Sequence, residues 1–415
     1  MNKLFKTKVN FLVIFVFILF LFKLPNFYLI PILKASFLTT HVLARGLLFL
    51  LFILNIKKIT YLFSRNKIFF IVLLLFLIQS FSILQSFNTI SFLSRYKELI
   101  VGFMAFYTAL LFRKKYKILM DLLLITTILS VLIQLVLIIF PDILTQLFSR
   151  ILYYKLYDLV VINLARGRTY FETFDEIVIP IIFYLLVIEK KHGSKKFVLL
   201  FLFIIMTSLA IISGWRIRLA MLFFGSIASA FFVKDKVRYI VVLILSFSFL
   251  ISLFNFAYRN NTFTRLELTE ENTLSLESRI DQLSSTLTIL EGKPLGIGLG
   301  NYYDYLPGYA KNSKYLITGK LQQQQGLIAE ENVHNIFGLI AVESGIPAII
   351  IFITLLLFFV RNDYCLIRMK DYPKISFMIG FWIMFIYSFF NPLIPGVANY
   401  LFWFLRGYSI MEIRK

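Results

Sequence analysis

The sequence contains little cysteine, little histidine and few acidic residues. Among its 415 residues there are one cysteine, three histidines and 22 Asp and Glu residues, about half as many as the 43 Lys and Arg residues. The single cysteine, Cys365, excludes an intramolecular disulfide. Because the histidines are scattered and only one cysteine is present, the sequence also argues against a transition-metal site.

Charged residues are scarce as well, and hydrophobic residues outnumber them. Only 16% of the residues are charged, 59% are hydrophobic, and the mean hydropathy is +0.83. Soluble domains are usually about 45–50% apolar, so this composition predicts an all-α polytopic membrane protein. The net charge of +21 could indicate nucleic-acid binding. However, the basic residues stand in short clusters between apolar runs, and membrane topology explains this pattern better.

Twelve apolar runs approach the length of about 20 residues that one membrane-spanning helix needs. The runs are continuous rather than alternating, which favours helices over strands. Met1–Lys8 and the following run resemble a signal sequence, but no small-residue cleavage site follows, so we expect a retained first helix. The predicted spans are residues 9–31, 35–56, 68–87, 97–112, 118–140, 174–190, 196–213, 215–233, 238–256, 335–360, 375–391 and 396–411.

The Lys and Arg clusters between the spans predict the orientation, because cytoplasmic loops are enriched in these residues. They place both termini in the cytoplasm, as in a multi-pass protein of the plasma (inner) membrane, and two longer segments outside, Pro141–Thr173 and 257–334. We therefore expect one membrane domain in three parts. Residues 1–256 hold spans one to nine, 257–334 form a long extracytoplasmic loop, and 335–415 hold spans ten to twelve.

His334 stands where the long loop enters the tenth predicted span. On a helix with 100° per residue, four small residues fall within about 40° of its direction, namely Gly338, Ala341, Gly345 and Ala348. Such a stripe permits close helix packing, so His334 is expected to point into the bundle. Glu343 falls on the opposite face, where its charge needs a partner of its own. A lone histidine is more often structural than catalytic, so both interpretations remain open.

Two arginines, Arg216 and Arg218, begin the eighth predicted span. The helix dipole disfavours a cation at a helix N-terminus, which suggests that an anion is held there. Alternatively, both side chains extend to lipid headgroups. The two lie about 200° apart on a helix, so at most one of them faces a cavity well. Arg45 and Arg406 are further intramembrane cations, either functional or close enough to a span end to reach the headgroups.

The long outer loop contains a predicted amphipathic helix followed by a glycine-rich segment, within Leu276–Tyr303. Gly296, Gly298 and Gly300 could cradle a phosphate. No strand precedes them, as a dinucleotide-binding motif requires, so a tight turn is favoured. Arg279 in the amphipathic stretch is by default a solvated surface charge.

The other long outer segment combines basic and acidic side chains near Pro180, at the start of the sixth predicted span. These are Arg166, Arg168, Glu172, Asp175 and Glu176. The three acids could bind a divalent cation, which prefers oxygen ligands. They could equally complement the dipole at the start of a helix, which is the interpretation we favour.

Four motifs between residues 166 and 348 are similar to those of the O-antigen ligase and polymerase superfamily of polyprenyl-linked glycan transferases. The segment RGRTYFETFDE matches its arginine–aromatic motif at Arg166 and Phe171, while Thr169 and Asp175 replace the usual glycine and asparagine. The segment SGWR resembles a helix-start motif at Ser213 and Arg216. A Ser-Arg pair followed by Pro-Leu-Gly-x-Gly-x-Gly is matched by Ser278, Arg279, Pro294, Gly296, Gly298 and Gly300. The ligase signature His-Asn, nine residues, Gly is matched by His334, Asn335 and Gly345, with Ala348 in place of its usual closing residue.

The resemblance implies a C-type glycosyltransferase architecture that acts outside the cytoplasm. The donor would be a glycan on undecaprenyl pyrophosphate, the acceptor a hydroxyl of a glycan or lipid, and no nucleotide, metal or other cofactor is implied. Arg216 and Arg279 would hold the pyrophosphate, and His334 would act at the acceptor. Arg166, Arg218, Asn335 and the three glycines would bind substrate.

Three other functions remain open on the sequence. A polysaccharide polymerase would use the same donor with a different acceptor. A transporter or flippase for the lipid-linked glycan would be expected to show internal repeats and midplane polar residues, and we see no clear repeat. A non-catalytic membrane scaffold would leave the arginines and His334 without a shared cavity.

Overall fold

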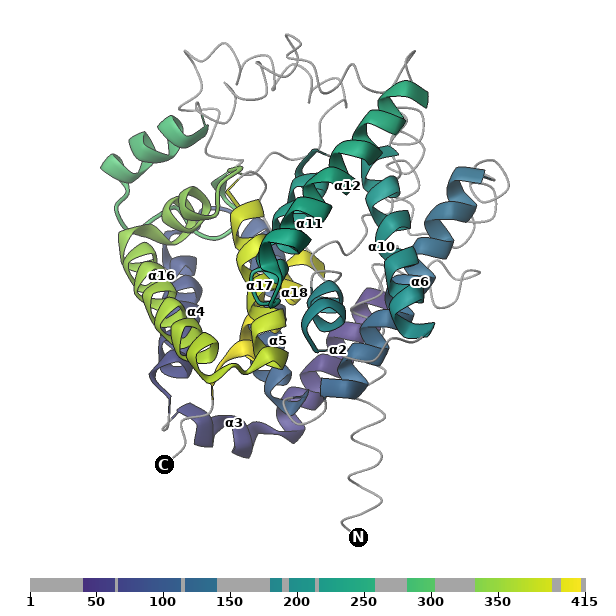
Figure 1. Cartoon of the computed structure of the whole chain (residues 1–415). Coiled ribbons are helices and arrows are strands. Elements are labelled where there is room, and N and C mark those ends of the chain that lie inside the picture. Colours follow the sequence, from purple (N-terminus) through teal and green to yellow (C-terminus); the bar gives the residue numbers. More distant parts are fainter. Residues whose placement is uncertain are drawn as a thin grey trace, which may run out of the picture.

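The computed structural model describes residues 40–63, 66–112, 116–139, 180–188, 194–212, 216–257, 282–302, 333–389 and 397–411. Within these ranges every regular element is a helix, which confirms the all-α prediction for this part of the chain. Figure 1 shows the arrangement of these helices. The first predicted span, 9–31, lies outside the described residues.

Most of the predicted spans in the described ranges correspond to helices. The N-terminal group comprises α2 (Thr40–Leu54), α3 (Ile56–Phe63), α4 (Lys67–Phe81), a 3₁₀ turn Ser82–Gln85, α5 (Thr89–Thr108), a second 3₁₀ turn Ala109–Phe112, and α6 (Tyr116–Ile139). A π-helical turn Tyr184–Ile188 comes next, followed by α10 (Ser194–Ile212), α11 (Arg216–Ala230) and α12 (Lys236–Ala257). The C-terminal group comprises α16 (Ile336–Met369), α17 (Tyr372–Tyr387) and α18 (Val397–Ser409).

Among the described residues, two helical segments are long and apolar enough to cross a membrane, Lys67–Gln85 and Ile336–Met369. Three shorter apolar helical segments accompany them, Val42–Leu54, Leu219–Ala230 and Tyr372–Tyr387. The described part is therefore that of an all-helical, apolar membrane protein. The twelve spans, the three-part division and the orientation stay predictions.

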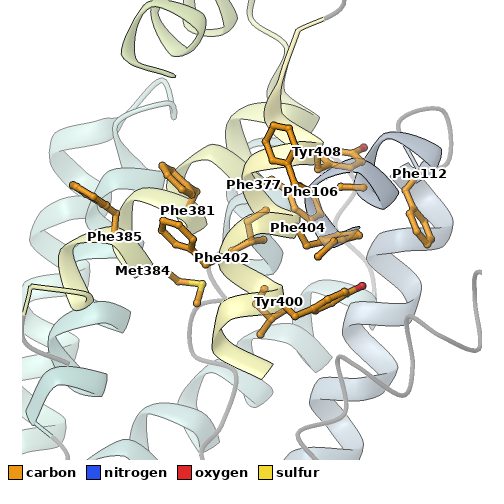
Figure 2. Packing of buried hydrophobic residues seen from close by; sticks show 14 of the residues in the cluster. Phe106, Phe112, Phe377, Phe381, Met384, Phe385, Tyr400, Phe402, Phe404 and Tyr408 are labelled. Atoms are coloured by element: carbon orange, nitrogen blue, oxygen red, sulfur yellow. The ribbon is translucent and has the colours of Figure 1, made fainter. Parts of the chain in front are cut away.

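The hydrophobic core lies where α18 packs against α5 and α17, while α16 lies beside α4 (Figure 1). Aromatic side chains fill much of it, and Figure 2 shows Phe377 and Phe381 of α17 near side chains of α18. The ring centroids are 4.3 Å apart for Phe377 and Tyr408, and 4.7 Å for Phe381 and Phe402. Such closely packed aromatic pairs contribute stability beyond their buried area, so they hold α17 against α18.

Helix α16 is interrupted, which corrects the assumption of one continuous helix from His334 to Ala348. It begins after Asn335, whose side chain caps it by accepting from the amides of Phe337 and Gly338. At Gly345 the backbone is non-helical, with φ 79° and ψ −179°. The four predicted small residues therefore do not form one stripe in register with His334. The helix also continues beyond the predicted end at 360, to Met369.

Candidate functional site

Residues 293–302, which we call the glycine loop, lie against the interruption of α16. An uninterrupted helix would pair the carbonyl of Val342 with the amide of Ile346, and that of Glu343 with residue 347. Residue 347 is a proline without an amide hydrogen, and the Ile346 amide instead donates to Pro294 O at 2.9 Å. The loop supplies the missing donors. The amide of Ile297 donates to Val342 O at 2.9 Å, and that of Gly298 to Glu343 O at 3.0 Å.

The loop glycines are required by the backbone conformation. Gly296, Gly298 and Gly300 have φ of 85°, 92° and 73°, in the left-handed region that side chains disfavour. Their amides donate to Lys293 O at 2.9 Å, to Glu343 O at 3.0 Å and to the Glu343 carboxylate at 2.8 Å, respectively. The segment thus has the turn that the sequence favoured, with these amides bonded inside the protein. Substrate binding by the three glycines stays a prediction.

Glu343 has the partners that its predicted position demanded. Its carboxylate is buried, with 2% of the residue exposed, and its Oε1 accepts from the Gly300 amide at 2.8 Å and from Arg95 Nε at 3.3 Å. Arg95 belongs to α5 and is buried as well. A buried charge needs such compensation. The Arg95–Glu343 ion pair therefore ties the glycine loop, α16 and α5 together.

A cavity adjoins this ion pair. Arg95 and Glu343 line it together with Gln79 of α4, Asn399 and Trp403 of α18, and several apolar side chains. Asn301 of the glycine loop fixes the loop to the start of α5. Its Oδ1 accepts from the Asn88 amide at 2.9 Å, and its Nδ2 donates to Ser86 Oγ at 2.7 Å.

The part of α16 before the interruption, residues 336–344, is called the half-helix here. His334 lies at its N-terminal end, one residue before the capping Asn335. It is half-buried, and both its backbone N and its ring Nδ1 lie 3.1 Å from Oε1 of Gln282. Gln282 is 1% exposed and belongs to a helix described over residues 282–292. At a rise of 1.5 Å per residue, Glu343 is roughly 10 Å along the helix axis from Ile336. The ion pair therefore anchors the half-helix from the far end, while Gln282 holds His334.

The remaining predicted site residues are placed only in part. Arg216 is the first residue of α11 and Arg218 lies in its first turn, as the sequence predicted for the start of that helix. The side chains of both lie outside the described residues. Arg166, Arg279 and the segment with Arg168, Glu172, Asp175 and Glu176 also lie outside them. The structure thus brings His334 and Asn335 together with the glycine loop around one half-helix. The roles of the arginines stay predictions.

Arg45 and Arg406 each pair with an acidic residue of another helix. Arg45 bonds Glu98 of α5. Arg406 is fully buried, and its Nη1 lies 2.7 and 2.9 Å from the two carboxylate oxygens of Asp363. The fixed, planar guanidinium suits such a buried pair, so both arginines join helices in the described structure.

Sequence reasoning missed Gln282, Arg95 and Asp363. Gln282 stands three residues after Arg279, a spacing that puts two side chains on one helical face, and this could have indicated it. The charged pair Arg95 and Glu98, three residues apart before an apolar run, could have indicated that the fourth span begins earlier. No such signal exists for the pairing of Asp363 with Arg406, which are far apart in the sequence.

In a comparison with known protein families, residues 198–353 match the family model described as O-antigen ligase. The matched range contains Arg216, Arg279, the glycine loop and His334, whereas Arg166 precedes it. It confirms the resemblance to the O-antigen ligase and polymerase superfamily. No curated protein matches the chain. Among the described residues, no group of three or more His, Cys, Asp or Glu side chains could hold a metal ion.

Proposed function

Because residues 198–353 match the family model described as O-antigen ligase, we propose that this protein is a membrane glycosyltransferase. It transfers a glycan from undecaprenyl pyrophosphate to an acceptor hydroxyl on the extracytoplasmic face of the plasma membrane. The observation that carries the proposal is the placement of His334 within the matched range. This histidine is half-buried, bonded to a buried side chain and set at the start of a half-helix that is anchored at its other end.

The proposed reaction needs a base at the acceptor. The acceptor oxygen attacks the anomeric carbon, a new C–O bond forms, and the bond between that carbon and the pyrophosphate oxygen breaks. The electron pair leaves with the lipid pyrophosphate, and the acceptor proton passes to the imidazole of His334. Histidine suits this role because its ordinary pKa lies near neutrality.

Two arginines support the leaving group in this proposal. Arg216 and Arg279 stabilise the negative charge that develops on the pyrophosphate, since a guanidinium offers paired donors in a fixed geometry. Arg216 begins α11, and the N-terminal amides of a helix favour an anion in the same place. Arg166, Arg218, Asn335 and the glycine loop contribute to substrate binding.

A ligase and a polymerase share this chemistry and differ in the acceptor. With a lipid or core-oligosaccharide acceptor the protein is a ligase of surface polysaccharide assembly. With a second lipid-linked glycan as acceptor it is a polymerase. Incubation of the purified protein with the donor alone and with each acceptor separates the two, because only a polymerase lengthens the glycan when the donor is the sole substrate.

The test of glycosyl transfer uses the full chain in proteoliposomes with a lipid-linked oligosaccharide. A transferase forms a new glycosidic bond and releases undecaprenyl pyrophosphate, whereas a flippase moves the intact donor across the bilayer. Arg216→Lys should reduce transfer by roughly 100-fold or more, because an ammonium loses the paired donors. Arg238→Lys is the matched control, since Arg238 is exposed in the first turn of α12. Intact donor translocation without product would contradict the proposal.

The extracytoplasmic location has its own test. A reporter that is active only outside the cytoplasm should be active when fused near Lys311, in the long loop, and inactive near Lys114. The reverse pattern would place His334 on the cytoplasmic side and overturn the proposed site of transfer.

A further inference from the structure

Gln282 and His334 meet through two contacts on one atom. The Oε1 atom of Gln282 lies 3.1 Å from the backbone N of His334 and 3.1 Å from its ring Nδ1. We propose that Gln282 is a positioning residue that holds the neutral imidazole of His334 in the tautomer with its proton on Nδ1. The lone pair is then on Nε2, the atom that receives the acceptor proton. The inference deepens the proposed function and rests on it for the catalytic role of Nε2.

The backbone contact decides which atom of the Gln282 side chain faces His334. A backbone N–H can only donate, so the atom opposite it must be an acceptor, which the carboxamide oxygen is and the amide nitrogen is not. The same oxygen faces Nδ1. Because an amide oxygen has no hydrogen to give, Nδ1 must carry the proton of this contact. In neutral imidazole, Nε2 is then unprotonated.

The surroundings keep Gln282 from turning away. Gln282 belongs to the helix of residues 282–292 and is buried. Its backbone carbonyl accepts a hydrogen bond from Thr286 Oγ1 at 2.8 Å. That helix, the glycine loop and the first half of α16 share a buried hydrophobic cluster of their own, which comprises Ile289, Ile297, Tyr302, Val333, Leu339 and Val342. Close packing continues at Gly338, where an added Cβ would come within 2.9 Å of Val333 Cγ1. The two partners therefore lie on one packed unit.

The contact also serves the protonated state. When Nε2 takes the acceptor proton, the resulting imidazolium keeps Nδ1–H directed at Gln282 Oε1. A hydrogen bond from a charged donor is stronger than one between neutral groups, so the contact stabilises the cation that the step creates. Gln282 thus orients the ring before the step and supports it afterwards, as an acidic partner does for histidine in hydrolytic triads.

Nuclear magnetic resonance reads the tautomer without any substrate. The chain has three histidines, so the full protein labelled with ¹⁵N-histidine in detergent gives three imidazole signals, and the His334→Gln variant assigns the one in question. At a pH of about 8.5 an ordinary imidazole, with a pKa of about 6.5, is neutral. We expect the ¹⁵N shifts of His334 to report a proton on Nδ1. A proton on Nε2 in the unmodified protein would overturn the inference and leave glycan transfer intact.

Variants of Gln282 link the tautomer to turnover. Gln282→Leu should release the tautomer preference and lower turnover at least about 10-fold, as loss of a histidine-orienting partner does elsewhere. Gln282→Glu keeps an acceptor for both contacts and should retain the Nδ1 proton and most of the turnover. Thr288→Val, an exposed position on the same helix, is the control and should change neither.

The outcomes separate the inference from the proposed function. A Gln282→Leu variant that turns over at the wild-type rate, or a Gln282→Glu variant as inactive as Gln282→Leu, would contradict the positioning role. If the unmodified protein shows the Nδ1 proton but transfers no glycan to any acceptor, the proposed function fails and with it the catalytic role of Nε2.

Discussion

Helix α16 carries a buried ion pair near each end, and the two pairs differ in their surroundings. Asp363, near the C-terminal end, accepts from Arg406, from Trp382 Nε1 at 2.7 Å and from Asn362 Nδ2 at 3.1 Å. Glu343, near the N-terminal end, accepts hydrogen bonds through Oε1 from Arg95 Nε at 3.3 Å and from the Gly300 amide at 2.8 Å. It also borders the cavity.

The difference indicates that the two ion pairs have different roles. Neither Asp363 nor Arg406 lines the cavity that Arg95 and Glu343 border. The guanidinium lies 4.0 Å over the Phe359 ring and donates to Phe359 O at 3.1 Å, so the pair joins α16 to α18. The Arg95–Glu343 pair instead secures a loop and a half-helix whose other end presents His334. We therefore expect the first pair to contribute to folding and the second to hold the candidate site in shape.

The largest effect on stability is expected at the Asp363–Arg406 pair. Arg406→Met removes the cation and leaves Asp363 charged and buried, which costs about 3–5 kcal/mol in buried pairs. Thermal unfolding of the detergent-solubilised protein measures it, with the exposed Arg238→Met as control. Arg406→Met combined with Asp363→Leu should recover part of the loss, because no uncompensated charge then remains. An Arg406→Met variant as stable as the control would show that the pair contributes nothing to folding.

A smaller effect is expected at the pair beside the cavity. Glu343→Gln keeps an oxygen for the Gly300 amide but removes the charge that Arg95 faces, and a hydrogen bond to a charged group contributes about 1.5–3 kcal/mol. Unlike Arg406→Met, this variant should lose transfer activity at temperatures where it remains folded. Activity and unfolding temperature measured on the same preparation test this. Equal activity per folded molecule would mean that both pairs serve folding alone.

A further change addresses the interruption of α16 itself. Gly345→Ala introduces a Cβ that would lie 2.4 Å from the carbonyl carbon of Leu295, at a φ of 79°. Strain of this kind costs roughly 1–3 kcal/mol, and relief requires the glycine loop to move. Gly46→Ala is the control, because nothing lies within 4 Å of its added Cβ and alanine favours the helix. Protease accessibility of the glycine loop should rise for Gly345→Ala and not for Gly46→Ala; the same accessibility in both would contradict the account.

Apolar runs in the sequence predicted most described helices, since membrane-spanning segments must satisfy their backbone internally and remain apolar. The fourth predicted span shows where this reasoning stops. Helix α5 begins at Thr89, capped by the Asn88 side chain, rather than near residue 97. Arg95 lies in the part of α5 that the prediction left out, and Glu98 lies at the start of the part that it included. Each is paired with a residue of another helix, and such pairing depends on tertiary contacts.

The candidate site was predictable only as separate motifs. The sequence identified His334, Asn335 and the three glycines, and it required a partner for Glu343. It did not identify the interruption at Gly345, because a fixed angle per residue assumes a continuous helix. The Ile346–Pro347 pair directly after that glycine was the available signal. The contact between Gln282 and His334 joins segments 52 positions apart, so no periodicity could have indicated it.

The central claim is that His334 performs chemistry, and His334→Ala tests it most directly. Donor binding and product formation are measured with the purified variant in detergent, alongside its yield and unfolding temperature. We expect normal accumulation and retained donor binding, with transfer reduced by roughly 10²- to 10⁴-fold, the usual contribution of a general base. Turnover near the wild-type rate, or a parallel loss of folded protein and activity, would contradict the claim.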